Sequence, residues 1–314
     1  MLRDLYLGAS IAISWAWGTS LILGMQIAQT KGVEAFGIWA AANCLTLAFF
    51  GQLYKRGVLT EGIIKRPWVN SIMLVIQCFC LLIQLKVLSE VLAYFIPSPL
   101  WCYALTALIG LGFVWGMYKR GLETSIFTDN FQWAWTILAL LAMLGVCAIG
   151  GADVRVLPSS SASDVSWAWW SACILMSGII TDTQHWQRAK ANGRGHAFEA
   201  ATVFFAVYLA IVFALSHFVL PATAQALLLI AVLGVTTSTI DSVAVACHRM
   251  INKQIGSAVC SLICIAYGAF LSVGLVDLWS YFGVVRVGLA AAMLALGIKS
   301  LEKNASWRKL ELEK

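Results

Sequence analysis

Long apolar runs dominate this chain and limit what it can fold into. Ten of them are long enough to cross a bilayer, which takes a helix of about 20 mostly apolar residues. Only 11% of the residues are charged, less than half of the roughly 25% found in soluble domains. The sequence therefore predicts an all-α integral membrane protein whose main partner is the lipid bilayer. In that setting the net charge of +6 does not indicate a nucleic-acid partner.

The five prolines all fall at the ends of these runs, which supports the boundaries because proline interrupts a helix. The predicted spans are residues 5–29, 33–54, 68–96, 100–118, 125–150, 167–187, 197–220, 222–247, 255–275 and 278–298.

Positive charges alternate between the loops. If the N-terminus is cytoplasmic, seventeen of the twenty-one Lys and Arg fall in cytoplasmic segments, as the positive-inside rule requires. The loops on the other side hold only Lys31, Lys86 and Arg155, and Arg286 lies inside the last span. We therefore expect a protein of the plasma (cytoplasmic or inner) membrane with both termini in the cytoplasm.

Ten spans divide into two sets of five, and an odd number per set inverts the second set relative to the first. This inverted repeat is the layout of many secondary transporters. It predicts a single transmembrane domain, 1–314, with a first repeat at 1–150, a linker at 151–166, a second repeat at 167–298 and a cytoplasmic tail at 299–314.

The stretch "VTTSTIDSVAVA" (235–246) places five hydroxyls and a carboxylate inside an apolar run. In a helix, Ser238, Asp241 and Ser242 share one face, and such oxygen ligands suit a hard monovalent cation. Alternatively, the hydroxyls bond to carbonyls of the preceding turn, and Asp241 pairs with the basic residues 248–249. A second polar patch, Gly18 to Ser20, permits a break in the first span. Carbonyls freed there could coordinate a cation; the alternative is close helix packing.

Three charged side chains lie within or near other spans. Asp129 is close to the start of its span and Asp182 close to the end of another, where water can satisfy each of them. Arg286 lies deeper, where a charge costs at least ~2.5 kcal/mol. We expect it to face the protein interior and pair with Asp129, Asp241 or an anionic solute. The alternative is snorkelling to the outer surface beside Asp277.

Four segments resemble the sodium/solute symporter family, which includes sodium-coupled sugar, proline, pantothenate and iodide carriers. "TTSTIDSVAVACHRMINK" is similar to the MSTxDSxLLxxSS segment of that family's eighth core helix, and "TDTQHWQRAKA" to the TDQxxxQRxLAAK segment that ends the sixth. "MYKRGLETSIFTDNFQW" and "GTSLILGMQIAQTKG" resemble segments of the fifth and first core helices. The resemblance covers nearly the whole chain. It implies a LeuT-like fold with helices 1 and 6 broken, in a shortened, ten-helix member of the family.

The resemblance also implies the residues that would bind ions. The main sodium site would use carbonyls and hydroxyls of helices 1 and 8, from Ser14, Trp17, Val235, Ser238 and Thr239. A possible second cation would lie between helices 5 and 8, at Asp129, Ser238, Asp241 and Ser242.

The solute would lie beside the break in helix 1. The candidate residues are Trp15, Gly18, Thr19, Gln77, Gln84 and Thr183. For each of them the alternative is an ordinary interhelical hydrogen bond. Thr183 stands where the family's sugar carriers have Gln, which argues against a sugar as the solute.

Together these features predict symport of a small polar solute, coupled to Na⁺ and working by alternating access, with H⁺ as the alternative coupling ion. No enzymatic chemistry is expected, and no particular oligomeric state is predicted. The rival hypothesis is a transporter-like solute sensor or membrane scaffold that does not transport. The tail "KSLEKNASWRKLELEK" has no obvious signalling domain, which favours transport.

Overall fold

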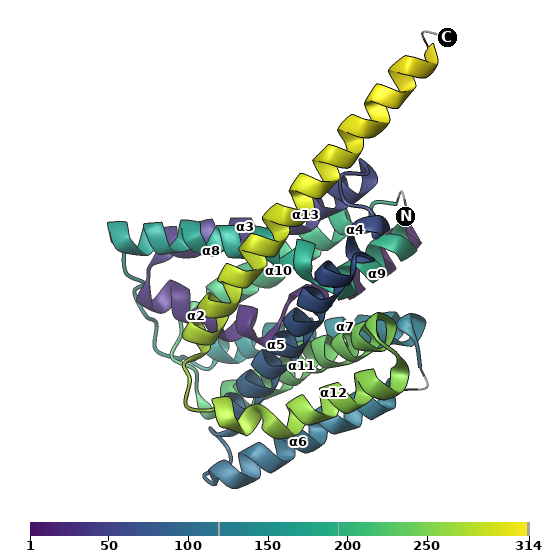
Figure 1. The fold of residues 1–314 in the computed structure, drawn as a ribbon. Helices are drawn as coiled ribbons and strands as arrows, with labels where there is room; N and C mark the ends of the chain where they lie inside the picture. The colour runs from purple at the N-terminus through teal and green to yellow at the C-terminus, as the bar shows by residue number, and fades with distance from the viewer. Residues whose placement is uncertain (119, 194, 313–314) are drawn as a thin grey trace.

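The computed structural model describes residues 1–118, 120–193 and 195–312, and every regular element in this part of the chain is a helix. The elements are α1 (Leu2–Trp15), α2 (Gly18–Thr30), α3 (Val33–Lys55), α4 (Glu61–Ile64), α5 (Pro67–Leu92), α6 (Pro99–Gly116), α7 (Leu122–Ile149), α8 (Ala162–Thr181), α9 (Thr183–Asn192), α10 (Ala197–Ser216), α11 (Ala222–Met250), α12 (Lys253–Ala266), the 3₁₀ turn η1 (Tyr267–Phe270) and α13 (Leu275–Leu312). Figure 1 shows their arrangement, with the C-terminal end of α13 projecting beyond the other helices.

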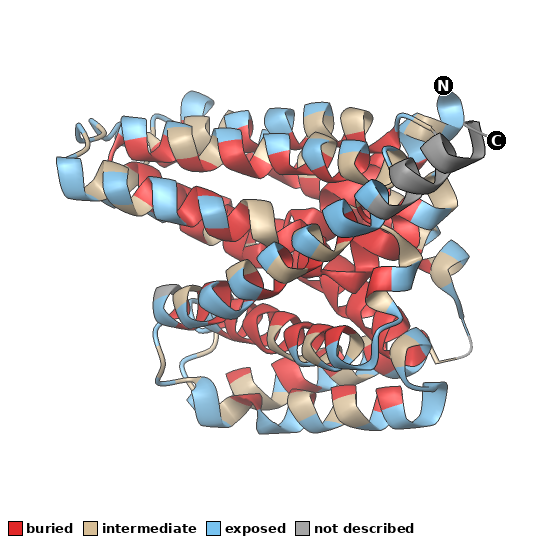
Figure 2. Cartoon of the chain, turned by 45° about the horizontal axis from the view of Figure 1, so that its top comes forward, coloured by how far each residue is buried: buried red, intermediate tan, exposed pale blue. Residues whose placement is uncertain are grey.

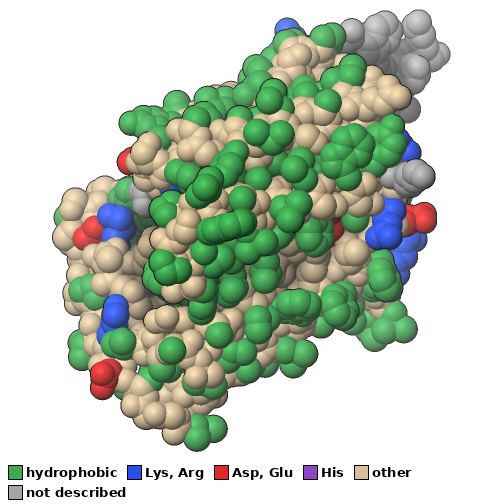
Figure 3. Space-filling model, turned by 90° about the horizontal axis from the view of Figure 1, so that it is seen from below, with side chains coloured by type: hydrophobic (Ala, Val, Ile, Leu, Met, Phe, Trp, Pro, Cys, Tyr) green, Lys and Arg blue, Asp and Glu red, His purple; other side chains and the backbone are tan. Residues whose placement is uncertain are grey.

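Several of these helices are long and apolar enough to cross a membrane. In the described residues there are eight, or nine if the bent pair α1 and α2 forms one span. The space-filling view in Figure 3 shows hydrophobic side chains across the middle of one face, with charged side chains towards its two ends. These observations confirm an all-α integral membrane protein.

Two of the predicted spans are interrupted. The first consists of α1 and α2, which meet at an angle of 65°. The sixth consists of α8 and α9, which meet at Asp182, a residue in extended conformation that ends one helix and caps the next. Hydroxyl and charged side chains lower the hydropathy of this sixth segment, so it is not among the eight apolar helices.

Local sequence explains where several helices begin. Pro67 and Pro99 occupy the first turns of α5 and α6, where the missing N–H has no helical partner to lose. Ser161 and Asp164 form a reciprocal capping box at the start of α8, which satisfies two backbone donors that a helix start leaves free.

Helix α11 lies at the centre of the molecule and packs against α5 and α7. Figure 2 shows the buried residues concentrated on such inner helices, while the outer faces of the peripheral helices are exposed. Further packed pairs are α1 with α7 and α10, α3 with α8, and α8 with α13. Residues far apart in the sequence therefore meet around α11.

Three of the charged residues that the sequence assigns to loops or wet helix ends are buried instead. Lys86, counted with the outside loops although the predicted span 68–96 contains it, lies within α5 and pairs with Glu90 (Nζ to Oε1, 2.9 Å). Asp182, predicted to be satisfied by water, is fully buried at the junction of α8 and α9. Arg188, predicted in a cytoplasmic segment, is also fully buried, because the break at Asp182 redirects α9 towards the centre.

Candidate functional site

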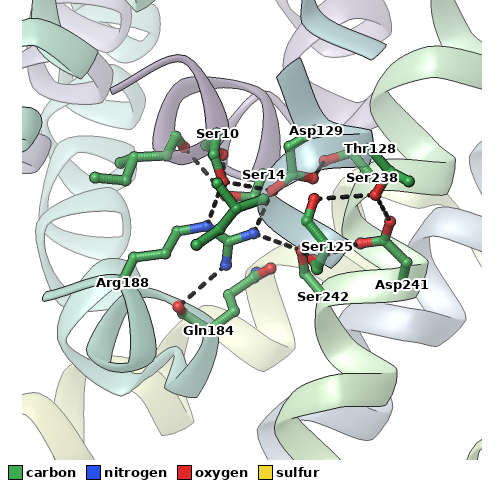
Figure 4. A network of polar contacts seen from close by, with 12 residues as sticks. Ser10, Ser14, Ser125, Thr128, Asp129, Gln184, Arg188, Ser238, Asp241 and Ser242 are labelled. Atoms are coloured by element: carbon green, nitrogen blue, oxygen red, sulfur yellow. Dashed lines mark hydrogen bonds and ion pairs between the residues drawn. The ribbon is translucent and has the colours of Figure 1, made fainter. Parts of the chain in front are cut away.

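A buried polar cluster forms where α1, α7, α9 and α11 meet, and Figure 4 shows its side chains pointing towards one another. Its charged members are Asp129 of α7, Arg188 of α9 and Asp241 of α11, none of which has any exposed surface. Its position near the start of a span allowed Asp129 to be hydrated by water, but the side chain is fully buried. Its environment is protein on every side.

Asp129 connects three helices through its two oxygens. Oδ2 accepts hydrogen bonds from Arg188 Nη2 (2.5 Å) and from Ser10 Oγ of α1 (2.5 Å). Oδ1 accepts from Ser238 Oγ of α11 (2.6 Å). The Arg188 guanidinium is further held by Ser10 Oγ (2.9 Å to Nε) and Ser242 Oγ (2.8 Å to Nη2). Charge-assisted bonds of this length are the stronger kind.

Asp241 lies beside this ion pair and is bonded only by hydroxyls. Ser125 Oγ and Ser242 Oγ donate to Oδ1 (3.0 and 3.2 Å), and Thr128 Oγ1 donates to Oδ2 (2.9 Å). Of the two alternative partners for Asp241, His248 contacts Ser257 instead (Nε2 to Oγ, 2.8 Å) and Arg249 is exposed. Asp241 therefore has no cationic partner within 4.0 Å among the described residues.

The cluster holds two acids and one base. With both carboxylates ionised, it would carry one surplus negative charge in a region that water does not reach. An uncompensated buried charge is costly, and it is normally neutralised or paired. One proton or one monovalent cation is the amount of charge that would balance this cluster.

The break in the first span also borders α11, where Gly18 lies against Thr236. In an unbroken helix the Gly18 N–H would donate to the Ser14 carbonyl. It donates to Gln84 Oε1 of α5 instead (2.9 Å), which leaves the Ser14 carbonyl without that partner. Glycine is required here, because a Cβ would lie 2.7 Å from both Thr236 and Val87.

The residues predicted to bind sodium all lie on α1, the break and α11, and all are buried. Their hydroxyls are engaged within the protein. Ser14 Oγ donates to the Ser10 carbonyl (2.8 Å), Thr239 Oγ1 donates to the Val235 carbonyl (3.1 Å), and Ser238 donates to Asp129. The Trp17 carbonyl accepts from Ser20 N (2.8 Å).

The residues predicted to bind the solute fall into three places. Trp15 and Thr19 line a small cavity beside the break, and Gly18 and Gln84 bond to each other at its edge. Gln77 lies elsewhere on α5 and donates to Asp182 Oδ1 (3.1 Å). Thr183 is separate from this group: its hydroxyl contacts Met250 Sδ (3.3 Å), in a different pocket.

Arg286 faces the interior, as predicted, and is only 2% exposed, so the snorkelling alternative is wrong. It does not pair with Asp129 or Asp241, however: Asp129 pairs with Arg188, and Asp241 is bonded by hydroxyls. Its guanidinium is flanked by the rings of Trp17 and Phe282, each centred 4.8 Å from Cζ. No Asp or Glu oxygen of the described residues lies within 4.0 Å of it.

Sequence reasoning missed several members of the cluster. Arg188 was assigned to a loop, and Ser10, Ser125 and Thr128 were not considered. Ser125, Thr128 and Asp129 share one face of a helix. Their spacing in the sequence therefore indicates a polar face on α7. Nothing in the local sequence indicated Ser10 or the inward direction of Arg188.

The fold and this cluster define an all-α membrane protein with two buried acids and one buried arginine at its centre. No known family model matches the chain, and no curated protein matches its sequence.

Proposed function

We propose that this protein is a secondary transporter that couples movement of a small polar solute to a monovalent cation, sodium or a proton, by alternating access. The observation that carries the proposal is the surplus acid in the buried cluster. Two carboxylates and one guanidinium, all without exposed surface, require one further positive charge when both acids are ionised.

The pattern of helix packing supports an inverted repeat of five plus five spans. The first repeat would contain α1 with α2, α3, α5, α6 and α7; the second would contain α8 with α9, α10, α11, α12 and α13. Exchanging the repeats turns several packed pairs into other packed pairs. Thus α1 with α7 corresponds to α8 with α13, α3 with α8 to α10 with α1, and α6 with α11 to α12 with α5. The broken span formed by α1 and α2 and the broken span formed by α8 and α9 are each the first span of their repeat.

The geometry suggests how the cation would be coupled to movement. Asp129 joins α1 to α11, because it accepts from Ser10 on one and Ser238 on the other. A cation that binds carboxylate oxygens competes with these hydroxyl donors and with Arg188. Cation occupancy would therefore alter the attachment of α1, the helix whose broken end borders the cavity. A ligand shifts such an equilibrium by its differential affinity for the two states.

Sodium-dependent stability of the purified protein tests the cation site. Replacing choline chloride with sodium chloride at constant ionic strength should raise the unfolding temperature, because a ligand that binds only the folded state stabilises it. Asp241→Asn keeps the shape and removes the surplus charge, so it should abolish the effect. Asp153→Asn, at an exposed position, is the matched control and should behave like wild type.

Coupling to a proton predicts a different outcome of the same experiment. The unfolding temperature would then follow pH and not sodium, and Asp241→Asn would remove the pH dependence. If neither ion stabilises the wild-type protein, cation coupling is excluded and the sensor or scaffold hypothesis is favoured. Uptake of labelled solutes into proteoliposomes, with and without the ion gradient, then separates transport from binding.

We also propose that both termini lie in the cytoplasm of a plasma or inner membrane, on the basis of the asymmetric Lys and Arg distribution. Single cysteines introduced at 61–66 should be labelled only from the cytoplasmic side, and those at 153–164 only from the outside. Labelling of 153–164 from the cytoplasm would reverse the orientation.

A further inference from the structure

A small cavity lies beside the break between α1 and α2, apart from the acidic cluster. Arg286 of α13 borders it, together with Trp17, Trp39 and Asn43. All four side chains are at least nine-tenths buried. Helices α3 and α13 and the break between α1 and α2 therefore bring polar groups to one small space.

The polar groups around this cavity are short of partners within the protein. Arg286 Nε, Trp17 Nε1, Trp39 Nε1 and both side-chain polar atoms of Asn43 have no hydrogen-bond partner among the described residues. The nearest polar contact of the guanidinium is a long one, from Nη2 to Cys80 Sγ (3.8 Å). Unsatisfied buried polar groups are costly, and several around one cavity indicate a missing ligand.

The chemistry of these groups determines which ligand would satisfy them. Arginine and tryptophan side chains can only donate hydrogen bonds, so the ligand must be mainly an acceptor. The guanidinium carries a full positive charge and is flanked by the rings of Trp17 and Phe282. Asp182, whose oxygens accept from Gln77 and Gln184, forms no ion pair with it. A ligand with one negative charge would match this surplus of donors and charge.

We infer that the cavity is the solute site and that the solute is a small organic monocarboxylate. A carboxylate offers two oxygens in the planar geometry that a guanidinium fork recognises. The indole walls of Trp15, Trp17, Trp39 and Trp279 would contact the apolar remainder of the solute. This inference rests on the proposed transport function, since it names the substrate class of that same transporter.

The cavity is too small for an organic solute in this structure. Its volume is about 20 Å³, room for roughly one water molecule. An organic acid can bind only after the surrounding helices separate. Alternating access supplies that movement, and the broken ends of α1 and α2 lie where it would occur.

Binding of matched acids and amides tests the charge requirement. Purified protein is titrated with propionate and benzoate, and in parallel with propionamide and benzamide, which have similar shape and no charge. The readouts are intrinsic tryptophan fluorescence, since four indoles line the cavity, and the unfolding temperature. The acids should change both readouts, and the amides should change neither. Equal binding of acids and amides, binding of chloride or bromide but no acid, or no acid binding at all would overturn the inference.

Two variants assign the binding to Arg286. Arg286→Gln should weaken acid binding by at least about thirtyfold, because loss of one partner from a buried charge pair is costly. Arg56→Gln, at an exposed position, should bind like wild type. Asn43→Asp places a carboxylate inside the cavity and should abolish acid binding in a protein that remains folded. Acid binding at wild-type affinity in Arg286→Gln would overturn the assignment.

The Asp241→Asn variant separates this inference from the proposed function. Suppose that acids bind through Arg286, but that Asp241→Asn removes no effect of sodium or pH on the unfolding temperature. Cation coupling is then wrong, and the acid site is supported. If the ion effects are present and no acid binds, the acid site fails and cation coupling stands.

Discussion

Arg188 and Arg286 are both buried arginines near the centre of one membrane protein, and their surroundings are opposite. Arg188 donates to Asp129, Ser10, Ser242 and the Gln184 carbonyl, and its ion pair with Asp129 has no exposed surface. Arg286 has two aromatic neighbours and no acid within ion-pairing distance among the described residues.

The difference separates two uses of the same side chain. A guanidinium whose donors are satisfied holds helices together, and its removal leaves a buried acid without its partner. A guanidinium whose donors are free contributes little to the fold and is available to a ligand. Because sites built for ligands are often costly to stability, removal of the two arginines should have effects of opposite sign.

The largest effect should come from Arg188. Arg188→Met keeps much of the side-chain volume and leaves Asp129 buried without its cation. The free energy of unfolding should fall by about 3–5 kcal/mol, the usual cost of breaking a buried pair. Denaturant unfolding in detergent measures the change. Lys190→Met, two residues along the same helix with an exposed side chain, should cost less than about 1 kcal/mol.

A double-mutant cycle with Asp129→Asn shows whether the ion pair is responsible. The double variant should lose much less than the sum of the single changes, because residues in contact are coupled. Additive losses would mean that Arg188 stabilises the fold by packing alone, and the contrast with Arg286 would disappear.

Arg286→Met should have a smaller effect, in the opposite direction. It removes a buried charge that has no acidic partner, which is stabilising, and it also removes two contacts with aromatic rings, worth roughly 0.5–2 kcal/mol each when desolvated. We expect the free energy of unfolding to be unchanged or raised by up to about 2 kcal/mol. A loss comparable to that of Arg188→Met would show that Arg286 has a partner within the protein.

Loss of the hydroxyls of α11 should destabilise the fold less than loss of Arg188. Ser238→Ala with Thr239→Ala removes one donor to Asp129 and one side chain bonded to its own helix, at a cost of about 1–3 kcal/mol. If these hydroxyls bind sodium, the concentration for half-maximal stabilisation should rise at least about tenfold, equivalent to about 1.4 kcal/mol.

Ser216→Ala is the matched control for these hydroxyls, because Ser216 is buried and its hydroxyl donates only to the Val212 carbonyl (2.9 Å) among the described residues. It should leave the response to sodium unchanged. Wild-type sodium dependence in the folded double variant would remove Ser238 and Thr239 from the cation site and leave Asp241 with Asp129 as its candidates.

Much of the site region could be predicted from local sequence. Gly18 to Ser20 indicated a break in the first span, and the structure has it just before them, at Ala16 and Trp17, where α1 and α2 meet at 65°. The spacing of Ser238, Asp241 and Ser242 indicated one polar face of a helix, and these residues lie together in the cluster. Helical periodicity and backbone freedom act over a few residues, so both features can be read from short segments.

The membrane class, the approximate span boundaries and the polar face of α11 were determined by the sequence itself, because hydropathy and helix geometry depend on neighbouring residues. Only the tertiary structure decided which charges are paired. Arg188 reaches Asp129 and Ser242, which lie 59 and 54 residues away in the chain, because α9 changes direction at Asp182. Arg286 lies instead between two aromatic rings, away from the acids that the sequence offered it. Electrostatic pairing depends on distance in space, and a single redirected helix changes those distances for every charge around it.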